Sequence, residues 1–146
     1  MNSPQQAMSR AGTIRDILTT CRTIAVVGLS PKPWRESFGV SQAMQAAGYR
    51  IIPVNPAAGA DSILGETVYP SLTAAAQHET IDLVNIFRNA DDVPPIVQEA
   101  IAIGARAVWM QLGIAHAAAA AQAEAAGLRV VQDACIAVEQ RRLPRG

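Results

Sequence analysis

Residues 26–37 read VVGLSPKPWRES, and this stretch decides how the rest of the sequence is interpreted. The apolar, β-branched run over residues 23–28 ends at Gly28, which is typical of a strand buried on both faces of a sheet. The loop that follows contains prolines, Lys32, Trp34 and Arg35 in place of further glycines. Ser37 is then predicted to cap a helix whose apolar residues recur at helical spacing. The stretch therefore predicts a strand, a stiff cationic loop and a helix.

The same order of strand, loop and helix repeats along the chain. Further strands are predicted at residues 49–54, 81–87, 105–112 and 128–132, with helices between them. Strands that alternate with helices form a parallel sheet through right-handed crossovers. We therefore predict an α/β fold, a single Rossmann-like domain over residues 1–146 with about five parallel strands and helices on both faces. Residues 1–12 are predicted to form a flexible N-terminal segment.

The composition excludes several classes of protein. The 146 residues carry 12 basic and 12 acidic side chains, so the formal net charge is zero and no basic footprint for nucleic acid is present. No apolar run approaches the roughly 20 residues of a membrane-spanning helix, and the polar N-terminus lacks the apolar core of a signal peptide. Cys21 and Cys135 have no metal-ligand spacing, and no metal site is expected. These features predict a cytoplasmic protein that binds neither nucleic acid nor membrane.

The residues that follow the predicted strands indicate an anionic ligand. In such a sheet, ligands bind beyond the carboxyl ends of the strands, near the switch in strand order. Lys32 and Arg35 follow the first strand, and Arg88 follows the third. These cations and the amide groups of a helix N-terminus attract phosphates, while Trp34 and Phe87 can cover a flat ring. The sequence therefore predicts a site for a nucleotide with several phosphates.

A nicotinamide dinucleotide fits this rim poorly. Its fingerprint places spaced glycines after the first strand and an acidic residue at the end of the second strand, where it binds the ribose hydroxyls. Here Gly28 stands without the later glycines, and Asn55 occupies the position of the acid. An oxidoreductase that uses a nicotinamide nucleotide is therefore an alternative function and not the leading one.

Longer motifs carry a resemblance to a known family. They are VVGLSPKPWRES, GYRIIPVNP, ILGETVYPSL, DLVNIFRNADDVPPIV, AIAIGARAVWMQLGI and AGLRVVQDAC, in this order. The chain resembles the small stand-alone CoA-binding proteins, which are similar to the N-terminal CoA-binding domain of the succinyl-CoA synthetase α subunit. The resemblance runs from Thr23 to Leu143, so it covers almost the whole chain.

The resemblance implies that coenzyme A or an acyl-CoA lies across the carboxyl edge of the sheet. Its phosphates would be held by the backbone of Gly28, Leu29 and Ser30 and by the side chains of Lys32 and Arg35. The remaining implied residues form the turn beneath the ligand, contact its adenine end and line the path of its pantetheine arm: Asn55 and Pro56, Phe87 and Arg88, and Gln111 and Gly113, respectively.

The sequence shows no catalytic constellation. The resemblance is incomplete at two places, because NADDV replaces a more basic segment and DAC replaces an arginine-containing DRC. We therefore expect a non-catalytic or regulatory CoA-binding protein and leave a protein partner open. Cys135 follows the last strand and gives a further alternative, exchange with the thiol of CoA. No neighbouring cation is present in DACIAVE to lower its pKa, which favours a small buried side chain instead.

Overall fold

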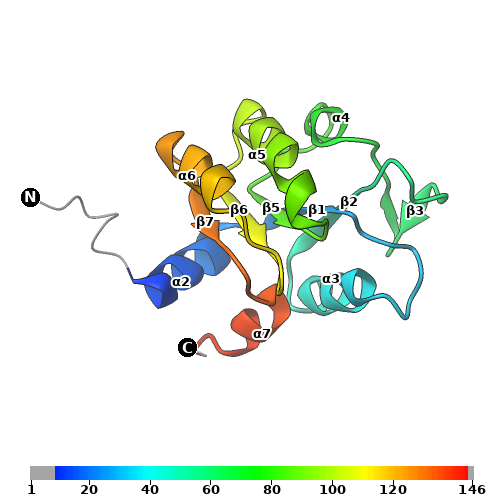
Figure 1. Cartoon of the computed structure of the whole chain (residues 1–146). Helices are drawn as coiled ribbons and strands as arrows, with labels where there is room; N and C mark the ends of the chain where they lie inside the picture. Colours follow the sequence, from blue (N-terminus) through cyan, green and yellow to red (C-terminus); the bar gives the residue numbers. More distant parts are fainter. Residues whose placement is uncertain (1–8, 145–146) are drawn as a thin grey trace, which may run out of the picture.

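The computed structural model describes residues 9–144, and a parallel sheet of five strands forms its centre (Figure 1). The strands are β1 (Thr23–Val27), β2 (Arg50–Val54), β5 (Leu83–Ile86), β6 (Ala107–Met110) and β7 (Arg129–Val131). They are hydrogen-bonded in the order β2-β1-β5-β6-β7, and every pair is parallel. The predicted α/β, Rossmann-like fold is confirmed, and each strand expected from the sequence is present.

Helices cover both faces of the sheet, as predicted. One face is covered by α2 (Arg10–Thr20), α3 (Glu36–Ala46) and α7 (Ile136–Arg141). The other face is covered by α4 (Leu72–Ala76), α5 (Val93–Ala102) and α6 (Ala117–Ala125). Figure 1 shows these two helical layers below and above the sheet. Because both faces are covered, the central strands β1, β5 and β6 are buried on both sides and, apart from Thr23 and Asn85, apolar.

The strand order determines which loops lie together. From β1 the chain moves outward to β2 on one side, and it then returns to β5 on the other side of β1. Val27, the last residue of β1, lies opposite both Val54 and Ile86. The loops after β1, β2 and β5 therefore leave the same edge of the sheet at its topological switch point, where open α/β sheets bind ligands.

Some local features differ from the sequence predictions. The segment after β2 contains a hairpin that was not predicted, of β3 (Ser62–Ile63) and β4 (Glu66–Thr67). The short 3-10 helix η1 (Ala90–Asp92) and the six-residue α7 were also not predicted. Elements of this length give no periodic pattern that a sequence can show.

The predicted flexible segment lies mostly outside the described residues. The structure describes none of residues 1–8, whereas residues 10–12 form the first turn of α2. The N-cap of this helix is Ser9, whose side chain accepts a hydrogen bond from the Gly12 amide. Among the helices that the structure describes, none is long and apolar enough to cross a membrane.

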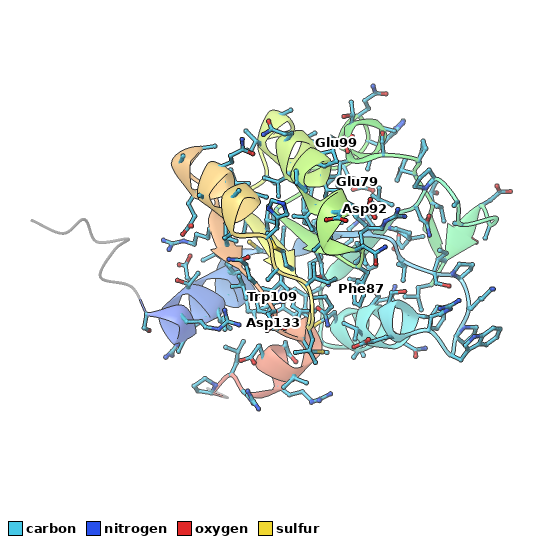
Figure 2. The ribbon with its side chains drawn as sticks, in the orientation of Figure 1. Glu79, Phe87, Asp92, Glu99, Trp109 and Asp133 are labelled. Atoms are coloured by element: carbon cyan, nitrogen blue, oxygen red, sulfur yellow. The ribbon has the colours of Figure 1, made fainter. Side chains whose placement is uncertain are left out.

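Trp109 joins the sheet to the loop that precedes α7. Its side chain is fully buried on the face covered by α2, α3 and α7 (Figure 2). The indole Nε1 donates a hydrogen bond of 2.8 Å to the carbonyl oxygen of Ala134. Trp34, in contrast, is 77% exposed. The two tryptophans of the chain therefore allow a direct comparison between a core position and a surface position.

Trp109→Phe is expected to lower the free energy of unfolding by about 2–4 kcal/mol, because it leaves the buried carbonyl of Ala134 unpaired and opens a cavity. Trp34→Phe is the matched control and should change this free energy by less than about 0.5 kcal/mol. Urea unfolding followed by far-ultraviolet circular dichroism measures both values. Equal effects of the two substitutions would contradict the structural role of Trp109.

Candidate functional site

A pocket of about 420 Å³ opens where the loops after β1, β2 and β5 meet the start of α3. The predicted site residues that line it are Gly28, Ser30, Lys32, Arg35, Asn55 and Phe87. The structure adds Pro31, Glu36, Ser37, Ala57 and Ala58 to the lining. Residues from separate loops are thus brought together at the switch point of the sheet.

Gly28 allows the loops after β1 and β5 to lie against each other. Its φ angle is +92°, a left-handed conformation that residues with a side chain rarely adopt. A Cβ atom at this position would lie 2.4 Å from the carbonyl oxygen of Phe87. The Gly28 amide also donates a hydrogen bond of 2.8 Å to the carbonyl oxygen of Val54. One glycine therefore connects all three loops that form the pocket.

The loop from Ser30 to Ser37 is held by hydrogen bonds within itself. The Ser37 hydroxyl accepts a bond of 3.0 Å from the Ser30 amide, and the Ser30 hydroxyl accepts one of 3.1 Å from the Lys32 amide. The Arg35 amide donates to the carbonyl oxygen of Lys32 at 3.0 Å, which closes a tight turn. These bonds hold the backbone of the loop that carries Lys32 and Arg35.

The prediction that Ser37 caps α3 is wrong. The helix begins at Glu36, its N-cap is Arg35, and no side chain makes a capping hydrogen bond there. Ser37 lies in the first turn, and its hydroxyl points back to the loop after β1. Tertiary folding has used this hydroxyl to shape the loop. The N-terminus of an eleven-residue helix, with the positive end of its dipole, is consequently left without a side-chain cap at the pocket wall.

The three predicted cations differ in their surroundings. Lys32 and Arg35 are exposed and line the pocket, and the Lys32 Nζ lies 5.9 Å from the centroid of the Trp34 ring, a cation–π contact. Arg88 does not line the pocket, and its Nη2 pairs with the Asp92 carboxylate at 3.2 Å. Two cations therefore face the pocket directly, and the third is held beside it by an acid of the NADDV segment.

The Asn55 side chain connects the loop after β2 to the loop after β1. Its Nδ2 donates a hydrogen bond of 2.9 Å to the carbonyl oxygen of Leu29, and its Oδ1 accepts one of 2.9 Å from the Ala57 amide. The side chain of Leu29 is fully buried, so only its backbone faces this region. Pro56 is exposed and does not line the pocket. The PVNP turn thus fixes the wall of the pocket next to the loop after β1.

Gln111 and Gly113 are tied to the loop after β7. The Gln111 Oε1 accepts a hydrogen bond of 3.2 Å from the Ile136 amide at the start of α7. The Gly113 amide donates one of 2.6 Å to Asp133 Oδ1, and Asp133 has a left-handed φ of +55°. Neither Gln111 nor Gly113 lines the pocket. Asp133 directly follows the last predicted strand, but sequence analysis assigned no role to its carboxylate, because its partner Gly113 is 20 residues away.

The side chains that could act as a nucleophile or a general base, Cys135, His116 and Cys21, lie at structural positions. Cys135, half-buried, lies directly before α7, and His116 is the N-cap of α6, where its Nδ1 accepts a hydrogen bond of 3.1 Å from the Ala119 amide. Cys21 lies at the opposite end of the sheet, and burial raises the pKa of its thiol above the ordinary value. Within residues 9–144, no group of three metal-ligating side chains is present.

Comparisons with known proteins agree over almost the whole chain. A family model described as a CoA binding domain matches residues 22–141. The protein YneT of Bacillus subtilis (strain 168) is 39% identical over 138 residues, which are 94% of this chain and 96% of YneT. A solved structure of a hypothetical protein from Pyrococcus horikoshii OT3 has a TM-score of 0.85 and 34% identity, covering 98% of this chain and 97% of that chain.

A more distant structure shares the fold. The apo form of the dinucleotide forming acetyl-coenzyme A synthetase 1 from Ca. Korarchaeum cryptofilum has a TM-score of 0.65 at 20% identity. The match covers 76% of this chain and 26% of that chain. At this identity the likeness shows that the same arrangement of strands and helices forms part of a larger protein.

Gly28→Ala is expected to lower the free energy of unfolding by about 2–4 kcal/mol, because the new Cβ meets the Phe87 carbonyl and the backbone conformation is strained. Gly39→Ala is the matched control. Gly39 lies within α3 with open space around it, so alanine there should raise this free energy by about 0.5–1 kcal/mol. Urea unfolding of both variants tests the assignment, and a neutral Gly28→Ala would refute the close approach of the two loops.

Proposed function

Because the chain belongs to the CoA-binding domain family, we propose that it binds coenzyme A or an acyl-CoA in the pocket between the loops after β1, β2 and β5. CoA is a nucleotide that carries a diphosphate, a 3′-phosphate and a pantetheine arm that ends in a thiol. A protein that recognises it needs cationic and amide groups for the phosphates and an extended path for the arm.

The observation that carries the proposal is the meeting of Lys32, Arg35 and the uncapped start of α3 in one pocket. Backbone amides at a helix N-terminus bind phosphate through hydrogen bonds and through the helix dipole. Lys32 and Arg35 add charge and donors that a glycine-rich loop lacks. Together they support the loop after β1 as the place where the phosphates are held.

The neighbouring residues orient the ligand in this proposal. Asn55 fixes the pocket wall through Leu29 and Ala57, and Phe87 offers an aromatic face from the loop after β5. Arg88, beside Gly28, exchanges its pairing with Asp92 for a contact with the adenosine end. Gln111 and Gly113, in the loop after β6 and hydrogen-bonded to the loop after β7, border the path of the arm.

We propose a role in binding rather than in catalysis. The ionisable side chains of the pocket lining are Lys32, Arg35 and Glu36, which suit charge recognition. General acid–base catalysis needs a positioned acid or base with a partner, and His116 already accepts a hydrogen bond from its own helix. Such a domain can report the presence of CoA to another protein or retain CoA for another enzyme.

A nicotinamide dinucleotide is disfavoured by the position of Asn55. In dinucleotide sites, an acid at the end of the second strand binds the ribose hydroxyls. Here Asn55 carries no charge, and its side chain is hydrogen-bonded to the Leu29 carbonyl and the Ala57 amide. This pairing favours CoA over the alternative function.

Lys32→Ala and Arg35→Ala are each expected to weaken the binding of CoA by about 1–3 kcal/mol, because each loses a charged hydrogen bond to phosphate. Isothermal titration calorimetry at low salt measures the loss of binding free energy in each variant, and this loss should become smaller when salt is added. Arg15→Ala removes an exposed cation of α2, away from the pocket lining, and should leave the affinity unchanged. Absence of heat with CoA, acetyl-CoA and a longer acyl-CoA would refute the proposed function.

A further inference from the structure

An acidic side chain lines the pocket in which phosphates are proposed to bind. Glu36, the first residue of α3, belongs to the same lining as Lys32 and Arg35. The residue is exposed, and within residues 9–144 its carboxylate makes neither a hydrogen bond nor an ion pair. The two neighbouring cations therefore leave its negative charge without a direct partner. An unpaired carboxylate at a phosphate site needs a physical reason.

The start of α3 explains why an acid is favourable in the free protein. The helix begins without a side-chain cap, so its first amide groups and the positive end of its dipole face the pocket wall. An acidic side chain in the first turn interacts favourably with this dipole and stabilises the helix. The same amide groups are those proposed to bind phosphate. In the free protein, Glu36 therefore supplies negative charge where a bound ligand supplies it in the complex.

Glu36 also limits the positive charge of the pocket. The charged side chains of the lining are two cations, Lys32 and Arg35, and one acid, Glu36, so their net charge is one positive unit. The helix dipole adds about half a unit of positive charge. Replacement of Glu36 by a neutral residue would raise this balance by a whole unit. The pocket is therefore only weakly positive, which suits a ligand with few negative charges.

The charge of a diphosphate depends on whether its outer phosphate is esterified. In CoA the diphosphate is esterified at both ends, so each of its phosphates carries about one negative charge. The terminal phosphate of ADP or ATP is a monoester and carries about two negative charges near neutral pH. The attraction of Lys32 and Arg35 for a phosphate group grows with this charge, and so does the repulsion from Glu36. The acid therefore opposes a free terminal phosphate more strongly than an esterified one.

We infer that Glu36 is a specificity-determining residue, which favours nucleotides whose diphosphate is esterified at both ends over ADP and ATP. This inference rests on the proposed function and narrows the class of ligand that the site accepts. CoA and ADP share the adenosine and its diphosphate, so attraction to these shared groups cannot separate them. Repulsion of the additional charge can, because specificity is a difference between two affinities. Glu36 offsets the advantage that the two cations give to a free terminal phosphate.

Glu36→Gln is the decisive substitution, because glutamine has the shape of glutamate without its charge. Calorimetry at about pH 8 compares dephospho-CoA, ADP and ATP, whose phosphates carry about two, three and four negative charges. EDTA is present, so that no divalent cation neutralises the phosphates. The substitution should lower the three dissociation constants by about threefold, fivefold and ninefold, respectively. The preference of the protein for dephospho-CoA over ATP should therefore fall about threefold.

Two further variants separate the charge of Glu36 from its shape and from the total charge of the protein. Glu36→Asp keeps the carboxylate in the first turn of α3 and should keep the preference of the wild-type protein. Glu124→Gln is the matched control, because it removes the charge of an exposed acid of α6 that lies outside the pocket lining. It should change each of the three dissociation constants by less than about 1.5-fold. Far-ultraviolet circular dichroism checks that each variant is folded.

The outcomes separate this inference from the proposed function. If Glu36→Gln changes the three dissociation constants by the same factor, or leaves them unchanged, the role of Glu36 in specificity is refuted while the proposed function stands. ADP and ATP that bind neither the wild-type protein nor Glu36→Gln would also refute it, because their rejection then comes from another part of the site. If the wild-type protein binds neither CoA nor dephospho-CoA, the proposed function is refuted, and this inference with it.

Discussion

The approach of the Phe87 carbonyl oxygen to the Cα of Gly28 is the contact on which the site depends. A Cβ at position 28 would meet this oxygen at 2.4 Å, so the loops after β1 and β5 can lie together only because the side chain is absent. The Gly28 amide also donates a hydrogen bond to the carbonyl oxygen of Val54, which holds the end of β2 and the loop after it beside the other two loops. The strand order places these loops at one edge, and Gly28 closes them to form a pocket.

The polar residues around the pocket divide into those that build it and those that remain available. Asn55, Ser37 and Asp133 use their side chains to hold backbone amides or carbonyls of neighbouring loops. These bonds replace the hydrogen bonds that irregular backbone lacks. Lys32, Arg35 and the first turn of α3 are then left facing the pocket. The hydrogen-bonded side chains thereby hold the pocket walls in place, and the two cations and the helix start remain available to a ligand.

Within residues 9–144, the buried atoms Ser41 Oγ, Asn85 Oδ1 and Gln111 Nε2 have no hydrogen-bond partner in the protein. They lie in the core, where polar atoms are normally satisfied. Sequence patterns ordinarily agree with packing in natural proteins, and the places where they conflict are often functional. Here Asn85 lies on the face of the sheet that α3 and α7 cover, because its strand neighbours Val26 and Trp109 belong to that core.

The sequence by itself determined the strands, most of the helices and the edge of the sheet where charged residues gather. These features depend on local patterns: a β-branched run such as residues 23–27 forms a buried strand wherever helices cover both faces. The sequence did not determine which polar groups stay free. Ser37 resembles a helix cap but holds Ser30, Arg88 resembles a phosphate ligand but pairs with Asp92, and Gln111 holds α7. The Ser37 and Arg88 bonds lie within single loops, whereas Gln111 and Ile136 are 25 residues apart. Only the tertiary structure decides them, because a hydrogen bond forms with whichever partner folding brings within about 3 Å.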